Sequence, residues 1–505
     1  LPAGFAAATA LATEVAGRGR VPPGGRGASP VGAPVPWWRA LLLPALAAAT
    51  ILAGYAALWR GGTSGAAVLL VVGYCALVPL ALLRAGAATR SREPMPPAYG
   101  GAAVVGGLVL ALYAATLAPT TAMWDASEYI AVARVLGLPH PPGNPLFVLL
   151  AHVAGLLPIP VSYAERINLL AAGTSAAAAA LWFLFAERVL RAVVPGRGAR
   201  LAAAGCAALV GATAFTVWNQ SVVNEKVYTV SLGFLALTSW LVLRWLDAVD
   251  PARADRLLVT IAYLAGLGYA VHPAGFLAGP AVALAVVLRR PTTLVRWRLL
   301  GGAAGALALG LSLFAVEPIR AAHDPAINEG EPTACVGGPR LGCTLSAETW
   351  RRLSANVQRA QYGGHDVMAR KAPFAAQLAG WWRYFEWQWW RDADERAPLA
   401  RRLVALAFLA LGLLGGWTHR RVERASWWYA APLMLSLTVL LVFYLNFNYT
   451  WGQSPELGDT VAREVRERDY FYVWTFSAWG VWVALGLATV WRALAARLGG
   501  RAAGG

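Results

Sequence analysis

Long apolar stretches recur along most of this chain, separated by short arginine-rich segments or by longer polar ones. A transmembrane helix needs about 20 predominantly apolar residues, and stretches near that length run from Trp37 to Trp491. The pattern predicts about twelve membrane-spanning helices, at residues 37–59, 66–83, 100–118, 166–186, 201–218, 227–245, 257–271, 274–288, 299–316, 403–417, 427–445 and 471–491. The fold class is therefore expected to be an all-α polytopic membrane protein, although the two stretches flanking His272-Pro273 could instead be re-entrant.

Composition supports the same class. Hydrophobic residues make up 58% of the chain and charged residues only 14%, which excludes a soluble enzyme built around one large core. The net charge is +17. With the N-terminus inside, the segments predicted to be cytoplasmic carry the whole excess of basic residues, whereas the opposite side is balanced. This positive-inside bias predicts a multi-pass protein of the cytoplasmic membrane with both termini inside, and argues against a nucleic-acid partner.

The polar segments divide the chain into five regions. The first is expected to be a disordered basic tail, and no cleaved signal peptide is expected. The regions are the tail at 1–36, two extra spans at 37–95, a core at 96–316 with an external loop at 119–165, an external segment at 317–402, and the last spans and tail at 403–505. Within the external loop, the apolar stretch 145–157 is predicted to be a surface or half-inserted helix, because a crossing there would invert the arginine-bearing segment that follows.

Two pairs of cysteines have different predicted roles. Cys75 and Cys206 lie inside predicted spans and are expected to be packing residues. Cys335 and Cys343 enclose a short Gly- and Pro-containing loop in the external segment. In an oxidising compartment this spacing favours a disulfide, and two cysteines are too few for a structural zinc site.

Asp125 and Glu128 are the first candidates for chemistry, because they lie three residues apart just after a predicted span. One reading is structural: Asp125 caps a short interfacial helix that ends at Gly137, and Glu128 completes a capping box. The apolar side chains of that helix, including Tyr129 and Val132, would then face lipid. The other reading makes one carboxylate a general base at the membrane edge. The spacing alone leaves both open.

Further polar residues lie at the predicted external edges. His140 opens a rigid proline-rich turn, and Arg320 stands where a span emerges and could bind phosphate or form a structural ion pair. The other candidates are Tyr228, His272, Arg359, Tyr362, Arg466 and Arg468. The tryptophan-rich run at 381–390 is read either as an interfacial aromatic belt or as a sugar-stacking platform. Nucleotide- and metal-binding signatures are absent from the sequence, so no cofactor or metal is expected.

Several of these motifs, in this order, resemble a prokaryotic multi-pass family. The resemblance rests on Asp125-Ala-Ser-Glu128-Tyr129, His140-Pro-Pro-Gly143, Arg166-Ile-Asn168, Pro318-Ile-Arg320, Arg359-Ala-Gln361-Tyr362-Gly363 and Arg466-Glu-Arg-Asp469-Tyr470. The family is catalogued as domain of unknown function 2723 and belongs to the GT-C membrane glycosyltransferases. Its animal relative is an endoplasmic-reticulum protein O-mannosyltransferase. The resemblance covers roughly Gly100 to Trp491 and leaves out residues 1–95.

The resemblance implies a GT-C-like bundle whose first external loop carries short interfacial helices. It also implies transfer of a sugar, with mannose the first choice, from a polyprenyl-phosphate carrier to an extracytoplasmic protein or glycan acceptor. A carboxylate of the first external loop would be the base, which corresponds to Asp125, with Glu128 as the alternate. Arg320 or the pair Arg466 and Arg468 would stabilise the lipid-phosphate leaving group. A transporter or flippase of lipid-linked sugars is the main alternative, and an envelope-assembly scaffold is the third.

Overall fold

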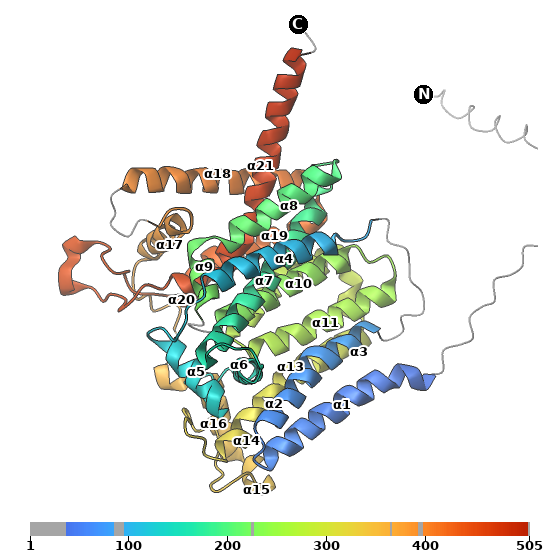
Figure 1. Cartoon of the computed structure of the whole chain (residues 1–505), viewed down its shortest axis with the longest axis vertical. Helices are drawn as coiled ribbons and strands as arrows, with labels where there is room; N and C mark the ends of the chain where they lie inside the picture. Colours follow the sequence, from blue (N-terminus) through green and yellow to red (C-terminus); the bar gives the residue numbers. More distant parts are fainter. Residues whose placement is uncertain (1–36, 85–94, 224–226, 364–365, 392–396, 503–505) are drawn as a thin grey trace, which may run out of the picture.

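The computed structural model describes residues 37–84, 95–223, 227–363, 366–391 and 397–502. The predicted tail at 1–36 lies outside these ranges. Within them the chain is helical, and the backbone pairs only at two isolated β-bridges, Leu138 with Asn328 and Tyr449 with Arg463. The predicted all-α class is therefore confirmed (Figure 1).

Eight helices in the described ranges are long and apolar enough to cross a membrane. They span Leu41–Trp59, Ser64–Arg84, Tyr163–Leu190, Tyr228–Leu246, Trp297–Ala321, Pro398–Val422, Arg424–Leu445 and Asp469–Leu498. A ninth arises if α8 (Arg197–Ala212) and α9 (Phe215–Val222), which meet at 70°, form one broken span. The other predicted spans correspond to the shorter α4 (Tyr99–Ala115), to α11 (Pro251–Tyr269), and to Pro273–Arg289, which contains α12 (Gly279–Arg289). All twelve predicted stretches are helical, while the count of twelve crossings stays a prediction.

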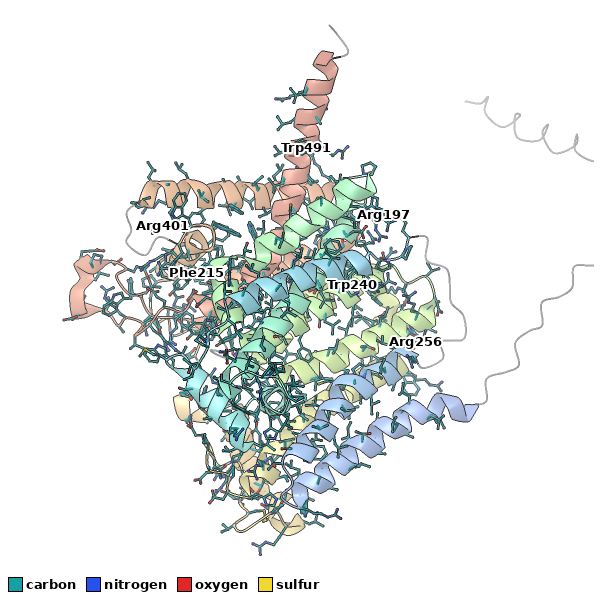
Figure 2. All side chains as sticks on the ribbon, in the orientation of Figure 1. Arg197, Phe215, Trp240, Arg256, Arg401 and Trp491 are labelled. Carbon is teal, nitrogen blue, oxygen red and sulfur yellow. A yellow bond between two sulfur atoms is a disulfide. The ribbon has the colours of Figure 1, made fainter. Side chains whose placement is uncertain are left out.

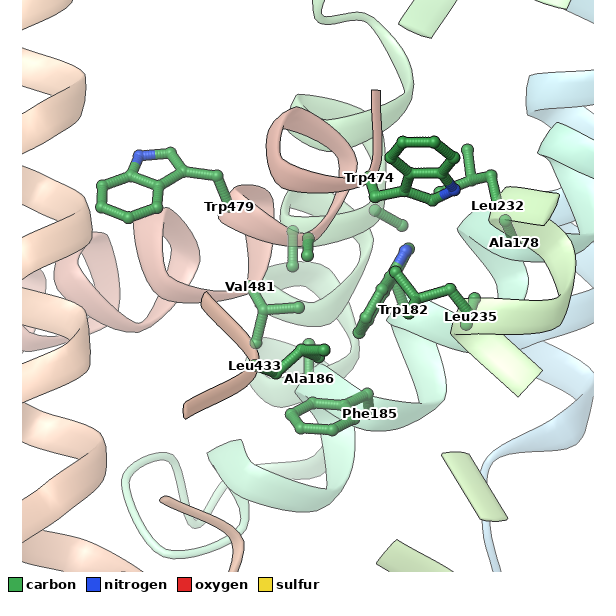
Figure 3. Close-up of a cluster of buried hydrophobic side chains, with 14 of the residues drawn as sticks. Ala178, Trp182, Phe185, Ala186, Leu232, Leu235, Leu433, Trp474, Trp479 and Val481 are labelled. Carbon is green, nitrogen blue, oxygen red and sulfur yellow. The ribbon is translucent and has the colours of Figure 1, made fainter. Parts of the chain in front are cut away.

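Close packing of small and aromatic residues holds the bundle together. α7 (Tyr163–Leu190) contacts α4, α8 and α10 (Tyr228–Leu246). α11 meets α13 (Trp297–Leu311) at Gly266, where a Cβ atom would lie 2.2 Å from the Leu307 carbonyl oxygen. Without strong hydrophobic attraction between helices in lipid, such close approach supplies the contact energy. Figure 3 shows the aromatic part of the core, where Trp182 of α7 lies between Phe185 of the same helix and Trp474 of α21 (Val473–Ala502).

The two extra N-terminal spans are part of this packing. They are α1 (Trp37–Trp59) and the segment from α2 (Ser64–Val71) to α3 (Val78–Arg84). α2 packs on α6 (Pro145–Gly155). There the buried His152 contacts Ser64 Oγ through Nε2 at 3.0 Å and donates from Nδ1 to the Ala133 carbonyl at 2.7 Å. One imidazole ring therefore connects α2, α6 and the helix that precedes α6.

The prediction that residues 145–157 form a surface or half-inserted helix is wrong about exposure. Nine of the eleven residues of α6 are buried in the bundle. Its eleven residues are nevertheless too few to cross a membrane, which needs about 20. α6 is shielded from lipid because α2, α5 (Asp125–Val135) and α7 pack against it.

The arginine-rich connecting segments gather at one end of the bundle. Arg188 binds Asp247 at 2.6 Å and lies 3.9 Å from Glu423, and Arg191 donates to the Met95 carbonyl at 3.1 Å. Figure 2 shows Arg197 and Arg256 on the right of the bundle, with Phe215 and Arg401 on the left. The described parts of the segments predicted to be cytoplasmic thus lie toward one end, and the described parts of the predicted external segments lie toward the other. The compartment that each end faces stays a prediction.

Candidate active site

The N-terminal turn of α5 presents the two predicted carboxylates. Asp125 is the first residue of the helix, and Trp124 before it has a φ of 69° and makes no side-chain cap. The predicted capping box is therefore wrong. Glu128 instead accepts a hydrogen bond from the His140 backbone N–H at 2.7 Å, and its second oxygen lies 2.7 Å from His140 Nδ1. A positive φ at a tryptophan is costly and tends to occur at functional sites.

The apolar side chains of α5 do not face lipid, contrary to the prediction. Tyr129, Val132, Ala133 and Leu136 are all buried, and the ring of Tyr129 meets Phe147 of α6 edge-on at 5.1 Å. The sequence showed an amphipathic helix but not that α6 would cover its apolar face.

Arg320 lies at the opposite end of α5 from Asp125. Its Nε donates to the Leu136 carbonyl at 2.6 Å and its Nη2 to the Val135 carbonyl at 3.1 Å. A guanidinium there satisfies carbonyl groups that the end of a helix leaves without intrahelical partners. The helix ends at Val135, two residues before the predicted Gly137. The structure therefore places Arg320 in a structural position outside the cavity described below.

The turn after α5 is fixed from beneath by α14 (Val316–Ala321). Gly143 has a φ of 83°, and a Cβ there would lie 2.2 Å from Oε1 of the buried Glu317. Glu317 accepts a hydrogen bond from Asn356 Nδ2 at 2.8 Å. Asn356 belongs to α16 (Ala347–Val357), and its carbonyl group accepts a hydrogen bond from the Arg359 backbone N–H at 2.9 Å. The buried carboxylate thus connects the His140 turn to the segment that carries Arg359.

A cavity of about 390 Å³ opens beside these elements. It collects eight of the predicted site residues from five separate parts of the chain, namely Asp125, His140, Tyr228, His272, Arg359, Tyr362, Arg466 and Arg468. Glu128 lies just behind this wall, in contact with His140. Of the predicted substrate-binding and catalytic residues, Arg320 alone lies apart from this group.

The arginines of the cavity lie on aromatic rings. Arg466 Nη2 is 3.6 Å from Asp125 Oδ2, and its guanidinium stacks 4.6 Å from the ring of Trp124. Arg468 binds Glu464 at 2.8 Å and donates to the Tyr470 hydroxyl at 2.9 Å. Burial lowers the pKa of Arg468, but Tyr470 and Glu464 raise that pKa by more, so the guanidinium stays charged. A positive region therefore lies directly next to the Asp125 carboxylate.

Aromatic side chains form another wall of the cavity. The Tyr228 ring lies 5.0 Å from His272 and 5.4 Å from Tyr470, and His272 stacks on Trp474 at 5.9 Å. Such rings offer flat apolar faces with polar edges, which suits a ligand that is partly apolar and partly hydroxylated.

Several lining residues were not predicted as site residues. They are Tyr129, Asn144, Tyr470 and Phe471, with Pro141, Pro142 and Val227. Asn144 has a φ of 46° and donates from Nδ2 to the Tyr129 hydroxyl at 2.6 Å. Burial raises the pKa of Tyr129 well above its ordinary value, so this hydroxyl stays protonated. The spacing of Asp125 and Tyr129, four residues apart on one helix face, could have identified Tyr129.

Two other predictions are settled outside the cavity. The disulfide between Cys335 and Cys343 is confirmed, with a Cα–Cα distance of 5.4 Å. The tryptophan-rich run lies in α17 (Phe374–Trp389), where Tyr384, Phe385 and Trp387 are buried. Trp389 stacks on Phe408 at 4.2 Å. The residues of this run do not line the cavity, so they provide no sugar-stacking face inside it, and the interfacial aromatic belt stays a prediction.

Metal-binding side chains are not concentrated at the site. In the described ranges, no three His, Cys, Asp or Glu side chains form a group that could hold a metal ion. That the reaction needs no cofactor stays a prediction.

Comparison with known proteins identifies a region of similarity that begins at Asp125. Residues 125–295 match the family model described as the protein O-mannosyl-transferase TMEM260 N-terminal domain. Over 170 residues the chain is 31% identical to the mouse protein O-mannosyl-transferase TMEM260, which covers 34% of this chain and 23% of the mouse protein. The chain therefore matches about a quarter of the length of that relative. No solved structure gives a significant match. These matches confirm the resemblance to an O-mannosyltransferase-like membrane protein.

Proposed function

We propose that this protein is a membrane glycosyltransferase of the GT-C type, which transfers a sugar, with mannose the first choice, to a protein hydroxyl group. The donor is a polyprenyl-phosphate-linked sugar, and the reaction takes place on the extracytoplasmic side of the cytoplasmic membrane. The observation that carries the proposal is the cavity, in which Asp125 lies 3.6 Å from Arg466 and near Arg468. A base and a charged binding site for a phosphate are the two groups that such a transfer requires.

In the proposed step, the Asp125 carboxylate takes the proton of a Ser or Thr hydroxyl. The hydroxyl oxygen attacks the anomeric carbon from the side opposite the phosphate, and a new C–O bond forms with inversion. The bond between the anomeric carbon and the phosphate oxygen breaks, and the polyprenyl phosphate leaves with the electron pair. A guanidinium stabilises that developing charge better than water does, because it is already oriented and partly desolvated.

The remaining residues have supporting roles in this proposal. Arg466 and Arg468 bind the leaving phosphate, together with Arg359, which lines the same cavity. Glu128 orients the His140 ring through its 2.7 Å contact, and the ring and Tyr362 contact the sugar or the acceptor. Tyr228 and His272 provide the aromatic wall. Glu128 is less suited than Asp125 to be the base, because both of its oxygens already contact His140.

The direct test uses purified protein in liposomes that contain polyprenyl-phosphate mannose, with a Thr-containing peptide as the acceptor. Mass spectrometry should detect a peptide that carries one hexose, and no product without the protein. Movement of the lipid-linked sugar across the bilayer without any transfer would support the transporter alternative instead.

A further inference from the structure

Two more hollows lie in the external segment, outside the cavity that holds Asp125. One, of about 250 Å³, is bounded by Pro141, Gly330 and Ala355. The other, of about 640 Å³, lies between residues 321–338 and α16. Nothing in the proposed sugar transfer uses either hollow.

The three spaces are neighbours that share wall residues. Pro141 lines both the catalytic cavity and the 250 Å³ hollow, and Glu331 and Arg352 line both the 250 and the 640 Å³ hollows. Figure 1 shows α5, α16 and α15 (Leu341–Thr344) following one another along the same edge of the molecule. We call the two outer hollows together the acceptor groove. The acceptor groove lies between the cavity that holds Asp125 and the loop closed by the disulfide.

The chemistry of the acceptor groove favours a polypeptide over a glycan or a prenyl chain. Among the described residues that line it there is no Phe, Tyr or Trp, and the flat faces on which sugars stack are therefore missing. Its lining combines both charge signs, as in Asp324 and Arg352, with small side chains and backbone. An extended peptide presents alternating side chains and regular N–H and C=O groups, which match such a surface.

The walls of the groove are held in place without a ligand. Arg352 donates from Nη1 to the Thr333 carbonyl at 2.9 Å and binds Glu348 at 2.8 Å. The Ala334 backbone N–H donates to Thr349 Oγ1 at 2.8 Å, and the disulfide of Cys335 closes the far end. A site that is formed in advance loses less conformational entropy on binding.

We propose that the acceptor groove binds the acceptor polypeptide in an extended conformation and delivers its Ser or Thr hydroxyl to Asp125. The inference rests on the proposed function and specifies its acceptor. The residues of the acceptor on one side of the reactive Ser or Thr would lie along α16. The affinity for the acceptor should therefore depend on peptide length, whereas the rate of the chemical step should not.

The test fills the groove and compares two acceptors with polyprenyl-phosphate mannose as donor. Ala355→Trp places an indole in the 250 Å³ hollow, and Ala347→Trp, on the same helix at an exposed position outside both hollows, is the matched control. For a long peptide with one central threonine, Ala355→Trp should raise KM about tenfold with kcat unchanged. For N-acetyl-threonine amide, which is too short to enter the groove, KM should not change. Ala347→Trp should behave as wild type with both acceptors.

A second measurement does not depend on how the tryptophan packs. A photoreactive residue at the exposed Gln361, which also lines the 250 Å³ hollow, should crosslink to the long peptide, whereas one at Ala347 should not. Equal effects of Ala355→Trp on both acceptors, or no crosslink at Gln361, would overturn the groove while leaving the sugar transfer intact. Transfer to a glycan but to neither peptide would also overturn it. Wild-type protein that transfers to no acceptor at all would refute the proposed function and the groove with it.

Discussion

Arg188 and Arg466, which lie at the two ends of the bundle, make different kinds of contact. At the end with short connections, Arg188 binds Asp247 through two nitrogens at 2.6 and 2.9 Å, and Arg191 and Arg200 both bind the buried Glu187. At the cavity end, Arg466 lies on the Trp124 ring at 4.6 Å and forms an ion pair with Asp125 at 3.6 Å. The first arrangement joins helices, and the second leaves a charged face directed at a cavity.

The comparison explains why charge alone does not identify a site. Bidentate pairs between Arg and a carboxylate neutralise both partners and fix the ends of neighbouring helices. A guanidinium stacked on an aromatic ring, as Arg466 is on Trp124, is held in addition by cation–π attraction. Substitutions at the two ends should therefore have opposite consequences, with activity lost at one and stability lost at the other.

The largest effect is expected from Asp125→Asn. If Asp125 is the base, sugar transfer should fall by about 10²- to 10⁴-fold, because the amide cannot accept the hydroxyl proton. The melting temperature should change little. Reconstituted transfer assays measure the loss, and Asp255→Asn, which removes a partner of Arg296 at the other end, is the matched control. Near-normal transfer by folded Asp125→Asn protein would remove Asp125 as the base.

Arg466→Lys should produce the next largest loss. Lysine keeps the charge but loses the planar stacking and the bidentate geometry, so kcat should fall by about 10²-fold, in line with loss of one oriented donor. The paired variant Arg188→Lys should lower the melting temperature and leave kcat of the folded protein unchanged. If both variants lowered kcat equally, the functional distinction between the two ends would fail.

Glu187→Ala should mainly affect stability. Glu187 is 3% exposed and binds Arg191 and Arg200. Because Arg200 is itself buried, removing the Glu187 carboxylate takes an ionic partner away from a buried guanidinium. Breaking such a pair costs about 3 kcal/mol, which thermal unfolding in detergent would detect. Transfer activity per folded molecule should remain at the wild-type value, and a large drop in it would count against a purely structural role.

The smallest effect concerns Glu329, beside the Glu128–His140 pair. Burial and then the charge of Glu128 raise the pKa of Glu329, while His140 lowers it. Because this pKa is higher in the folded than in the unfolded state, the folded state binds more protons. Stability from this group is therefore present below the unfolded pKa and is lost as pH rises through the folded pKa. Glu329→Gln should therefore reduce the fall in melting temperature that occurs as pH rises above the ordinary pKa of a glutamate. An unchanged slope would show that Glu329 is not responsible.

Much of the site could be predicted because its residues share one property, a position at the external edge of a span. The positive-inside bias predicts that Asp125, His272 and Arg466 lie on the same side of the membrane, and the cavity brings them together. The helical class followed from apolar stretches, since lipid leaves few other ways to satisfy the backbone.

The predictions that were wrong concern how each helix packs against its neighbours. Arg320 also lies at an external edge, but its direction depends on where α5 ends, and sequence pattern does not give that geometry. The apolar face of α5 could equally have met lipid or α6, because both are apolar partners. Likewise, Glu128 has the spacing of a capping box, and only the fold shows that the His140 turn returns to within 2.7 Å of it.

The ring of His152 contacts both Ser64 and the Ala133 carbonyl. Because of these contacts, the folding unit extends further toward the N-terminus than the region of sequence similarity does. The similar region starts at Asp125, yet the helix that begins there is supported through a residue of the second N-terminal span. A fragment cut at the start of the similar region would expose α6 to lipid or water and leave that imidazole without its hydroxyl partner. Transplanting the region that begins at Asp125 into another membrane protein would therefore require the first two spans to be carried along with it.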